Sequence, residues 1–159
     1  MKMKAPRQLP ISLGGAPKTE LRAQFAALCW RVQDGKVQVL MITSRGTRRW
    51  ILPKGWAMEG LTPAEAVAVE AWEEAGVTGK VVDRCLGIYS YEKELQGDQS
   101  FPCIAMVYPI KVKELARKYP EANQRRRKWM SPKKAAEKVA EPELAQILRD
   151  FNPAILSQV

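Results

Sequence analysis

The sequence contains no histidine, and this absence removes several kinds of chemistry at once. A Ser–His or Cys–His nucleophilic system needs an imidazole base, so neither can be built here. Metal sites that depend on histidine ligands are excluded in the same way. Any catalysis must therefore use carboxylates, Lys, Arg, hydroxyl groups or a bound ion.

Cysteine is scarce, with only Cys29, Cys85 and Cys103. Their odd number and wide spacing match neither a disulfide framework nor a zinc site. We expect them to act as small hydrophobic residues in a reducing compartment, which favours a cytoplasmic location.

Long apolar runs are missing too. No run approaches the roughly 20 residues that cross a bilayer, and no apolar stretch of the secretory kind follows the basic N-terminus. The 159 residues are 46% hydrophobic and 27% charged, which suits a folded domain rather than a disordered chain. We expect a flexible leader over residues 1–20, a single domain over residues 21–159, no membrane partner, and a monomer or homodimer.

Charge is the first positive signal. Lys and Arg number 26 against 17 acidic residues, which gives a formal net charge of +9. An excess of this size favours an anionic partner, such as nucleic acid, an acidic membrane or a phosphorylated small molecule. A solubilising surface would produce the same excess, so charge alone does not decide.

Hydrophobic patterning predicts a mixed α/β domain. Strands are expected at residues 24–32, 36–43, 50–52, 81–91, 102–112 and 125–130. Asp34-Gly35 forms a hairpin turn between the first two, and a polar connection spans residues 92–100. Two helices begin at Pro132 and Pro142. Strands, a helix, more strands and a helical tail indicate an α/β (α+β) fold with a mixed central sheet.

The clearest predicted helix covers residues 62–75. Thr62 can cap its start, Pro63 fits the first helical position, and Glu65 completes a capping box. Gly76 stands where a left-handed residue ends many helices.

Three acids crowd the end of this helix. Glu70, Glu73 and Glu74 are spaced i, i+3 and i+4, so they share one helix face. The negative end of the helix dipole lies there, and each acid loses about 0.3–1 kcal/mol where Lys or Arg would gain. A bound Mg²⁺ or Mn²⁺ would resolve the conflict, because these ions prefer oxygen ligands. A solvated acidic helix end is the alternative.

The residues before the helix decide between these interpretations. Gly55 opens a loop that leads into the capped helix, and the helix ends in the run from Glu70 to Val77. This segment resembles the Nudix box, a glycine that opens a 23-residue motif with a fixed acidic end. The positions that match in register are Gly55, Glu70, Ala71, Glu73, Glu74, Gly76 and Val77.

The flanks extend the resemblance from about residue 25 to residue 151. Arg45, residues 49–55 and residues 127–129 look like the diphosphoinositol polyphosphate phosphohydrolase branch of the Nudix family. The resemblance implies an α/β/α sandwich fold. It also implies Mg²⁺ or Mn²⁺ as cofactor, and attack by water on a phosphorus of a pyrophosphate.

The resemblance also assigns roles. Glu70, Glu73, Glu74 and the backbone carbonyl of Gly55 would bind the metal, and either Glu73 or Glu74 would act as base for the water.

Substrate phosphates need further cations. The candidates are Arg45, Arg48, Arg49 and Lys54 before the box, and Arg125, Arg126, Arg127 and Lys128 after it. In an extended strand, alternate side chains share a face, so Arg125 and Arg127 are expected to point together. A basic edge strand that discourages aggregation explains the second cluster equally well. Trp50 and Trp129 could stack on a base, but we expect core packing for both.

Two positions depart from the Nudix pattern. Leu61 stands where the motif has a glutamate, and Val69 where it has an arginine. In the family that arginine helps to orient the metal-binding carboxylates. Either the polar support is exchanged here for apolar packing, or the site is slow or inactive.

Three functions therefore stay open. The first is hydrolysis of a highly phosphorylated small molecule, such as a diphosphoinositol polyphosphate or a dinucleoside polyphosphate. The second is a catalytically silent domain that senses a phosphorylated ligand. The third is an RNA-binding or RNA-cap pyrophosphate-processing module, whose RNA affinity would fall steeply with salt.

Overall fold

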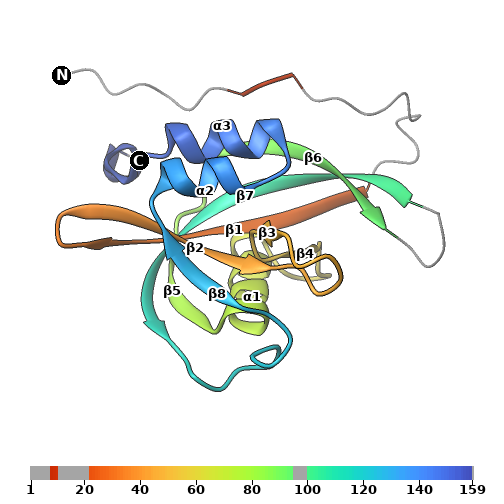
Figure 1. Cartoon of the computed structure of the whole chain (residues 1–159), viewed down its shortest axis with the longest axis horizontal. Helices are drawn as coiled ribbons and strands as arrows, with labels where there is room; N and C mark the ends of the chain where they lie inside the picture. Colours follow the sequence, from red (N-terminus) through yellow and green to blue (C-terminus); the bar gives the residue numbers. More distant parts are fainter. Residues whose placement is uncertain (1–7, 11–21, 95–99, 159) are drawn as a thin grey trace.

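A computed structural model describes residues 8–10, 22–94 and 100–158, and a mixed eight-stranded sheet forms its centre (Figure 1). The predicted leader over residues 1–20 lies outside the described residues except for 8–10. The strands are β1 (Arg22–Gln33), β2 (Lys36–Thr43), β3 (Trp50–Ile51), β4 (Lys54–Trp56), β5 (Val77–Val81), β6 (Gly87–Glu94), β7 (Ser100–Leu115) and β8 (Arg127–Met130).

The sheet runs in the order β3-β2-β1-β7-β5, with β4 paired to β1, β6 to β7 and β8 to β2. β1 and β7 are parallel, and the other pairs are antiparallel. Along one edge of β1, the first half pairs with β4 and the second half with β2. The sheet therefore splits at this edge, where the chain passes from β3 to β4.

Helices cover both faces of the sheet. α1 (Pro63–Ala75) lies on one face, and α2 (Pro132–Lys138) and α3 (Pro142–Asp150) lie on the other (Figure 1). A 3₁₀ segment, Pro153–Gln158, follows α3. Each face has its own buried cluster, one around Leu28, Met41 and Leu148 and one around Cys29, Ile42 and Val67. The predicted α/β/α sandwich is confirmed.

Most predicted elements are present, including the hairpin turn, where Asp34 and Gly35 have φ values of 52° and 75°. The single strand predicted over residues 81–91 is wrong, because the structure has β5 and β6 there. Both strands pair with β7, and Pro109 of β7 lies opposite the break between them. The carbonyl of Pro109 accepts from the Val82 amide at 3.1 Å, but proline has no N–H to return. The ladder is therefore interrupted at this residue.

The sequence does not predict the short strand β4, because it indicates a loop that opens at Gly55. Only three residues pair there, from Gln24↔Trp56 to Ala26↔Lys54. Such a short stretch carries too little alternation to signal a strand. In the described part of the chain, no helix is long and apolar enough to cross a membrane.

Both ends of α1 match their predicted chemistry. The Thr62 hydroxyl accepts from the Glu65 amide at 3.2 Å, and the Glu65 carboxylate accepts from the Thr62 amide at 2.9 Å. Gly76 ends the helix with φ of 68°.

The last turn of α1 contains no basic residue, and Arg127 of β8 supplies the missing positive charge. Its guanidinium donates to the carbonyl of Ala75 and to that of Ala116, each at 2.7 Å. A cation at this end is stabilising because it faces the negative end of the helix dipole.

We expect Arg127→Met to lower the free energy of unfolding by about 2 kcal/mol, because two carbonyls lose a charged donor. Urea titration measures the change in the free energy of unfolding, provided that the dependence of this free energy on urea concentration is the same for both proteins. Lys128→Met, at the exposed neighbouring position, is the control and should cost less than about 0.5 kcal/mol. Equal effects of the two substitutions would show that Arg127 does not hold the helix end.

Candidate active site

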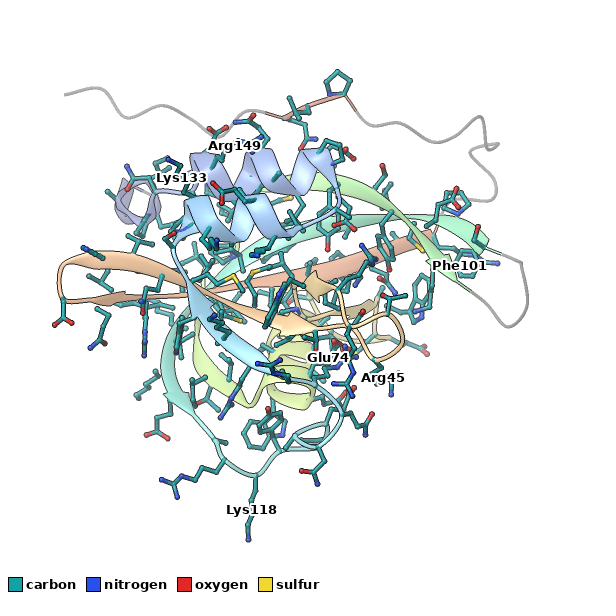
Figure 2. The ribbon with its side chains drawn as sticks, in the orientation of Figure 1. Arg45, Glu74, Phe101, Lys118, Lys133 and Arg149 are labelled. Carbon is teal, nitrogen blue, oxygen red and sulfur yellow. The ribbon has the colours of Figure 1, made fainter. Side chains whose placement is uncertain are left out.

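Two adjoining cavities lie where the sheet splits. One, of about 250 Å³, contains the acids Glu70, Glu74 and Glu121, and we call it the acidic cavity. The other, of about 280 Å³, we call the basic cavity. The lining residues that both share are Arg45, Ile51, Lys54, Lys93 and Arg125. Figure 2 shows Glu74 and Arg45, which both line the acidic cavity. An acidic site therefore opens directly into a cationic one.

Glu70 and Glu74 project from the last two turns of α1 and contact each other through a hydrogen bond. Glu74 is only 5% exposed. Burial, helped by the hydrogen bond to Glu70, raises the pKa of Glu74 to about 8. Burial also raises the pKa of Glu70. Two adjacent negative charges are therefore disfavoured at this position unless cations offset them.

Gly55 leaves room for the Glu70 carboxylate. A Cβ at position 55 would lie 2.2 Å from Oε1 of Glu70 and 2.3 Å from its Cδ. Only glycine allows the backbone to come this close to the carboxylate. The backbone of β4 and the acidic end of α1 therefore form one wall.

Arg125 is the cation nearest to the acids. Its guanidinium lies 3.3 Å from Glu74 and 3.1 Å from Glu121, and it also donates to the Thr43 carbonyl at 3.1 Å. The Glu121 amide in turn donates to the Glu73 carbonyl at 3.0 Å. The connection between β7 and β8 is thus fastened to α1 beside the acids. Arg45 reaches the same connection, 3.1 Å from Gln124 Oε1 and 3.7 Å from Glu121.

Lys54 lies between the two cavities, with Nζ 4.8 Å from the centre of the Tyr91 ring. Burial lowers the pKa of Lys54 to about 8, although nearby Glu74 and Glu141 act in the opposite direction. The Tyr91 hydroxyl donates to Gln24 Oε1, so the ring below the ammonium group is held in place.

Arg49 lines the basic cavity and pairs with Glu141, at 3.3 Å. Glu141 immediately precedes α3, and its buried Oε1 has no hydrogen-bond partner. The start of α3 therefore places a negative charge behind Arg49 and near Lys54.

The structure brings together most of the predicted site residues. The residues that line a cavity are Arg45, Arg49, Lys54, Gly55, Glu70, Glu74 and Arg125. Glu73, Arg48 and Arg127 line neither. Arg48 is exposed on the loop before β3, and Arg127 serves the end of α1. β8 begins at Arg127, so the strand predicted from residue 125 starts two residues too early. Arg125 and Arg127 nevertheless both reach the end of α1, at Glu74 and at the Ala75 carbonyl.

The apolar departure at Leu61 is not explained by packing. Leu61 is 39% exposed, so the proposed exchange of polar support for a buried apolar contact is wrong at this position. Val69 is half-buried on α1. The site orients Glu74 through Arg125 instead, from a part of the chain far away in sequence.

Several cavity residues were not predicted from the sequence. Among them are Gln24, Trp56, Tyr91, Lys93 and Glu121. Glu121 had a usable signal, because it precedes Arg125 by four residues and pairs with it. The other four come from β1, β4 and β6, and no local sequence pattern indicates how these strands are placed relative to one another.

The donor set suits a hard divalent ion, because Glu70, Glu74 and the adjacent Gly55 backbone offer only oxygen ligands. A bound cation would favour the charged form of both carboxyl groups. Within the described ranges, however, no three or more Asp, Glu or Cys side chains already stand together in a group that could hold an ion. The residues fit such an ion in chemistry, with two carboxylates already adjacent.

Comparison with known proteins shows the family to which the chain belongs. A family model described as the NUDIX domain matches residues 22–151. Nudix hydrolase 16, mitochondrial, of Arabidopsis thaliana is 38% identical over 120 residues, which cover 73% of this chain and 66% of that protein. Human diphosphoinositol polyphosphate phosphohydrolase 3-beta is 30% identical over 110 residues, covering 68% of this chain and 63% of that protein. The chain thus matches less than two thirds of the length of these relatives.

Among solved structures, the Ap4A hydrolase of C. elegans superposes with a TM-score of 0.59 at 19% identity. The superposition covers 85% of this chain and 98% of that one. At this identity the likeness supports the fold.

We expect Gly55→Ala to displace the Glu70 carboxylate and to weaken Mn²⁺ binding about 10-fold or more. Stability should change little, because the far end of a glutamate side chain can move. Calorimetric Mn²⁺ titration measures the affinity, with thermal unfolding in parallel. Gly46→Ala is the matched control, since a Cβ there meets nothing within 4 Å. If Gly55→Ala binds Mn²⁺ as tightly as the unmodified protein, the close approach of the backbone to Glu70 is not needed for ion binding.

Proposed function

We propose that this chain, which belongs to the NUDIX domain family, hydrolyses a phosphoanhydride bond in a phosphorylated small molecule. One observation supports the proposal above others: the buried Glu74, the half-buried Glu70 and a group of cations line adjoining cavities at the split of the sheet. Hydrolysis of a pyrophosphate would use both groups. The acids would lie beside the bridging P–O bond that breaks, and the cations would neutralise the negative charge of the other phosphate oxygens.

Hydrolases of this family generally depend on divalent metal ions. In this chain Glu70, Glu74 and the Gly55 carbonyl would hold Mg²⁺ or Mn²⁺, and Glu73 is added by the motif alone. When bound, the ion would neutralise phosphate oxygens and make water more acidic. Glu70 is kept in place by the space at Gly55, and Arg125 fixes Glu74.

Glu74 would accept the proton of the attacking water as the new P–O bond forms and the bridging P–O bond breaks. Of the two glutamates considered as base, Glu74 is favoured because it lines the acidic cavity and Glu73 does not. Lys54, Arg45 and Arg49 would bind the phosphates that are not attacked. Arg48 and Arg127 lie outside both cavities, so we assign them no contact with the substrate.

The substrate is proposed as a diphosphoinositol polyphosphate or a dinucleoside polyphosphate. The first class is named in a relative that is 30% identical, and the second in a structural neighbour. A cytoplasmic location and a monomeric or homodimeric state remain predictions.

Glu74→Gln tests the proposed hydrolysis. We expect it to lower kcat by at least about 100-fold, because both proton acceptance and cation binding are lost. Release of phosphate and nucleotide is followed across diphosphoinositol polyphosphates, dinucleoside polyphosphates, nucleoside triphosphates and nucleotide sugars, with Mg²⁺ and with Mn²⁺. Glu137→Gln, an exposed change on α2, is the control and should retain full activity.

Equal and negligible rates for the unmodified protein and Glu74→Gln would contradict the proposal. Tight binding of one of these compounds without turnover would then support a catalytically silent domain that senses a phosphorylated ligand. Leu61 and Val69, which replace polar residues of the motif, are the reason to consider that alternative.

A further inference from the structure

A buried carboxylate lies behind the basic cavity. Glu141 is 8% exposed and immediately precedes α3, which covers the sheet face opposite α1 (Figure 1). Its Oε2 atom pairs with the Arg49 guanidinium at 3.3 Å. Arg49 lines the basic cavity, whereas Glu141 lines neither of the two cavities. Any effect of Glu141 on a ligand there would pass through Arg49, or through space as a negative charge.

Stability alone does not account for this carboxylate. Among the described residues, its Oε1 atom has no hydrogen-bond partner, and its side chain makes no capping hydrogen bond with α3. A buried oxygen of a charged group that lacks a partner costs free energy. The positive N-terminal end of α3 offsets only part of this cost. Natural proteins accept such departures mainly at functional sites.

Arg49 is held at both ends. Its amide donates to the Ser44 hydroxyl at 2.9 Å, and its carbonyl accepts from the Ser44 amide at 2.8 Å. Glu141 holds the guanidinium at the far end of a side chain that is 42% exposed. This pairing uses the Nη1 atom and leaves other N–H groups of the guanidinium for a phosphate.

We propose that Glu141 is a positioning residue, which holds the Arg49 guanidinium ready to bind a substrate phosphate in the basic cavity. The inference rests on the proposed function and adds to substrate recognition a residue that lies outside both cavities. An exposed arginine has many rotamers, and ordering them opposes binding. A side chain that is already fixed loses less conformational entropy, so it contributes more to affinity.

Charge and position lead to opposite expectations for this residue. As a negative charge acting through space, Glu141 would repel an anionic ligand, and its removal would strengthen binding. As a positioning residue, Glu141 strengthens binding through Arg49, and its removal would weaken it. The direction of the change in affinity therefore separates the two roles.

Glu141→Gln tests the proposal, because it keeps the size of the side chain and removes its charge. The probe is diimidotriphosphate, a hydrolysis-resistant analogue of tripolyphosphate with NH groups in place of the bridging oxygens. Calorimetry with Mg²⁺ should show binding weakened about 5-fold. In turnover of the best substrate from the panel above, KM should rise by a similar factor while kcat stays within about 2-fold.

Glu143→Gln is the matched control. Glu143 is a second buried carboxylate at the start of α3, 6% exposed, and it accepts from the amide and the hydroxyl of Ser90, each at 2.9 Å. This substitution should lower the thermal unfolding temperature at least as much as Glu141→Gln does. It should leave the affinity for diimidotriphosphate unchanged, which separates a loss of stability from a loss of positioning.

Arg49→Met completes a double-mutant cycle. If Glu141 acts through Arg49, Glu141→Gln should no longer weaken binding once Arg49→Met is present. Unchanged or tighter binding in Glu141→Gln alone, or equal weakening with and without Arg49→Met, would overturn the positioning role and leave the proposed function standing. If the unmodified protein neither binds diimidotriphosphate nor cleaves any compound of the panel, the proposed function fails as well.

Discussion

The negative end of α1 is the constraint on which the rest of the site depends. Carbonyls of the last turn and the carboxylates of Glu70 and Glu74 gather there, and the helix itself contains no basic residue in its last turn. Positive charge has to come from elsewhere, and the segment around β8 brings Arg125 to the carboxylates and Arg127 to the carbonyls. The same arrangement leaves the acids poised to accept a stronger cation.

The split of the sheet gives this helix end its access to ligands. Because β1 pairs first with β4 and then with β2, neither partner covers the gap between them. The cavities open in that gap, with Lys54 and Gly55 at the start of β4 reaching both the acids and the cations. The geometry that weakens the sheet locally thus creates the site.

Local patterns in the sequence predicted what depends on local chemistry. The capping box at Thr62, the end of α1 at Gly76 and the acidic face of that helix all follow from residue spacing within a few turns. Local spacing does not predict the break between β5 and β6, because the cause of this break is Pro109 on a neighbouring strand. Cavity residues such as Gln24, Tyr91 and Lys93 were missed for the same reason, since register across strands places them. The sequence indicates the charge cluster at residues 125–128 but not the separate roles of its members. Only the contacts in the structure show that Arg125 pairs with the acids and that Arg127 binds the end of α1.

The connection between β7 and β8 has an unusual status for a surface loop. Such loops normally absorb insertions and deletions during evolution. Here the Ala116 amide donates to the Gly76 carbonyl at 2.8 Å, the Glu121 amide donates to the Glu73 carbonyl, and Arg127 binds Ala75 and Ala116. A change in the length of this connection would break several of these hydrogen bonds. Related sequences that prefer a different ligand would therefore be expected to differ at other segments, such as the turn between β2 and β3.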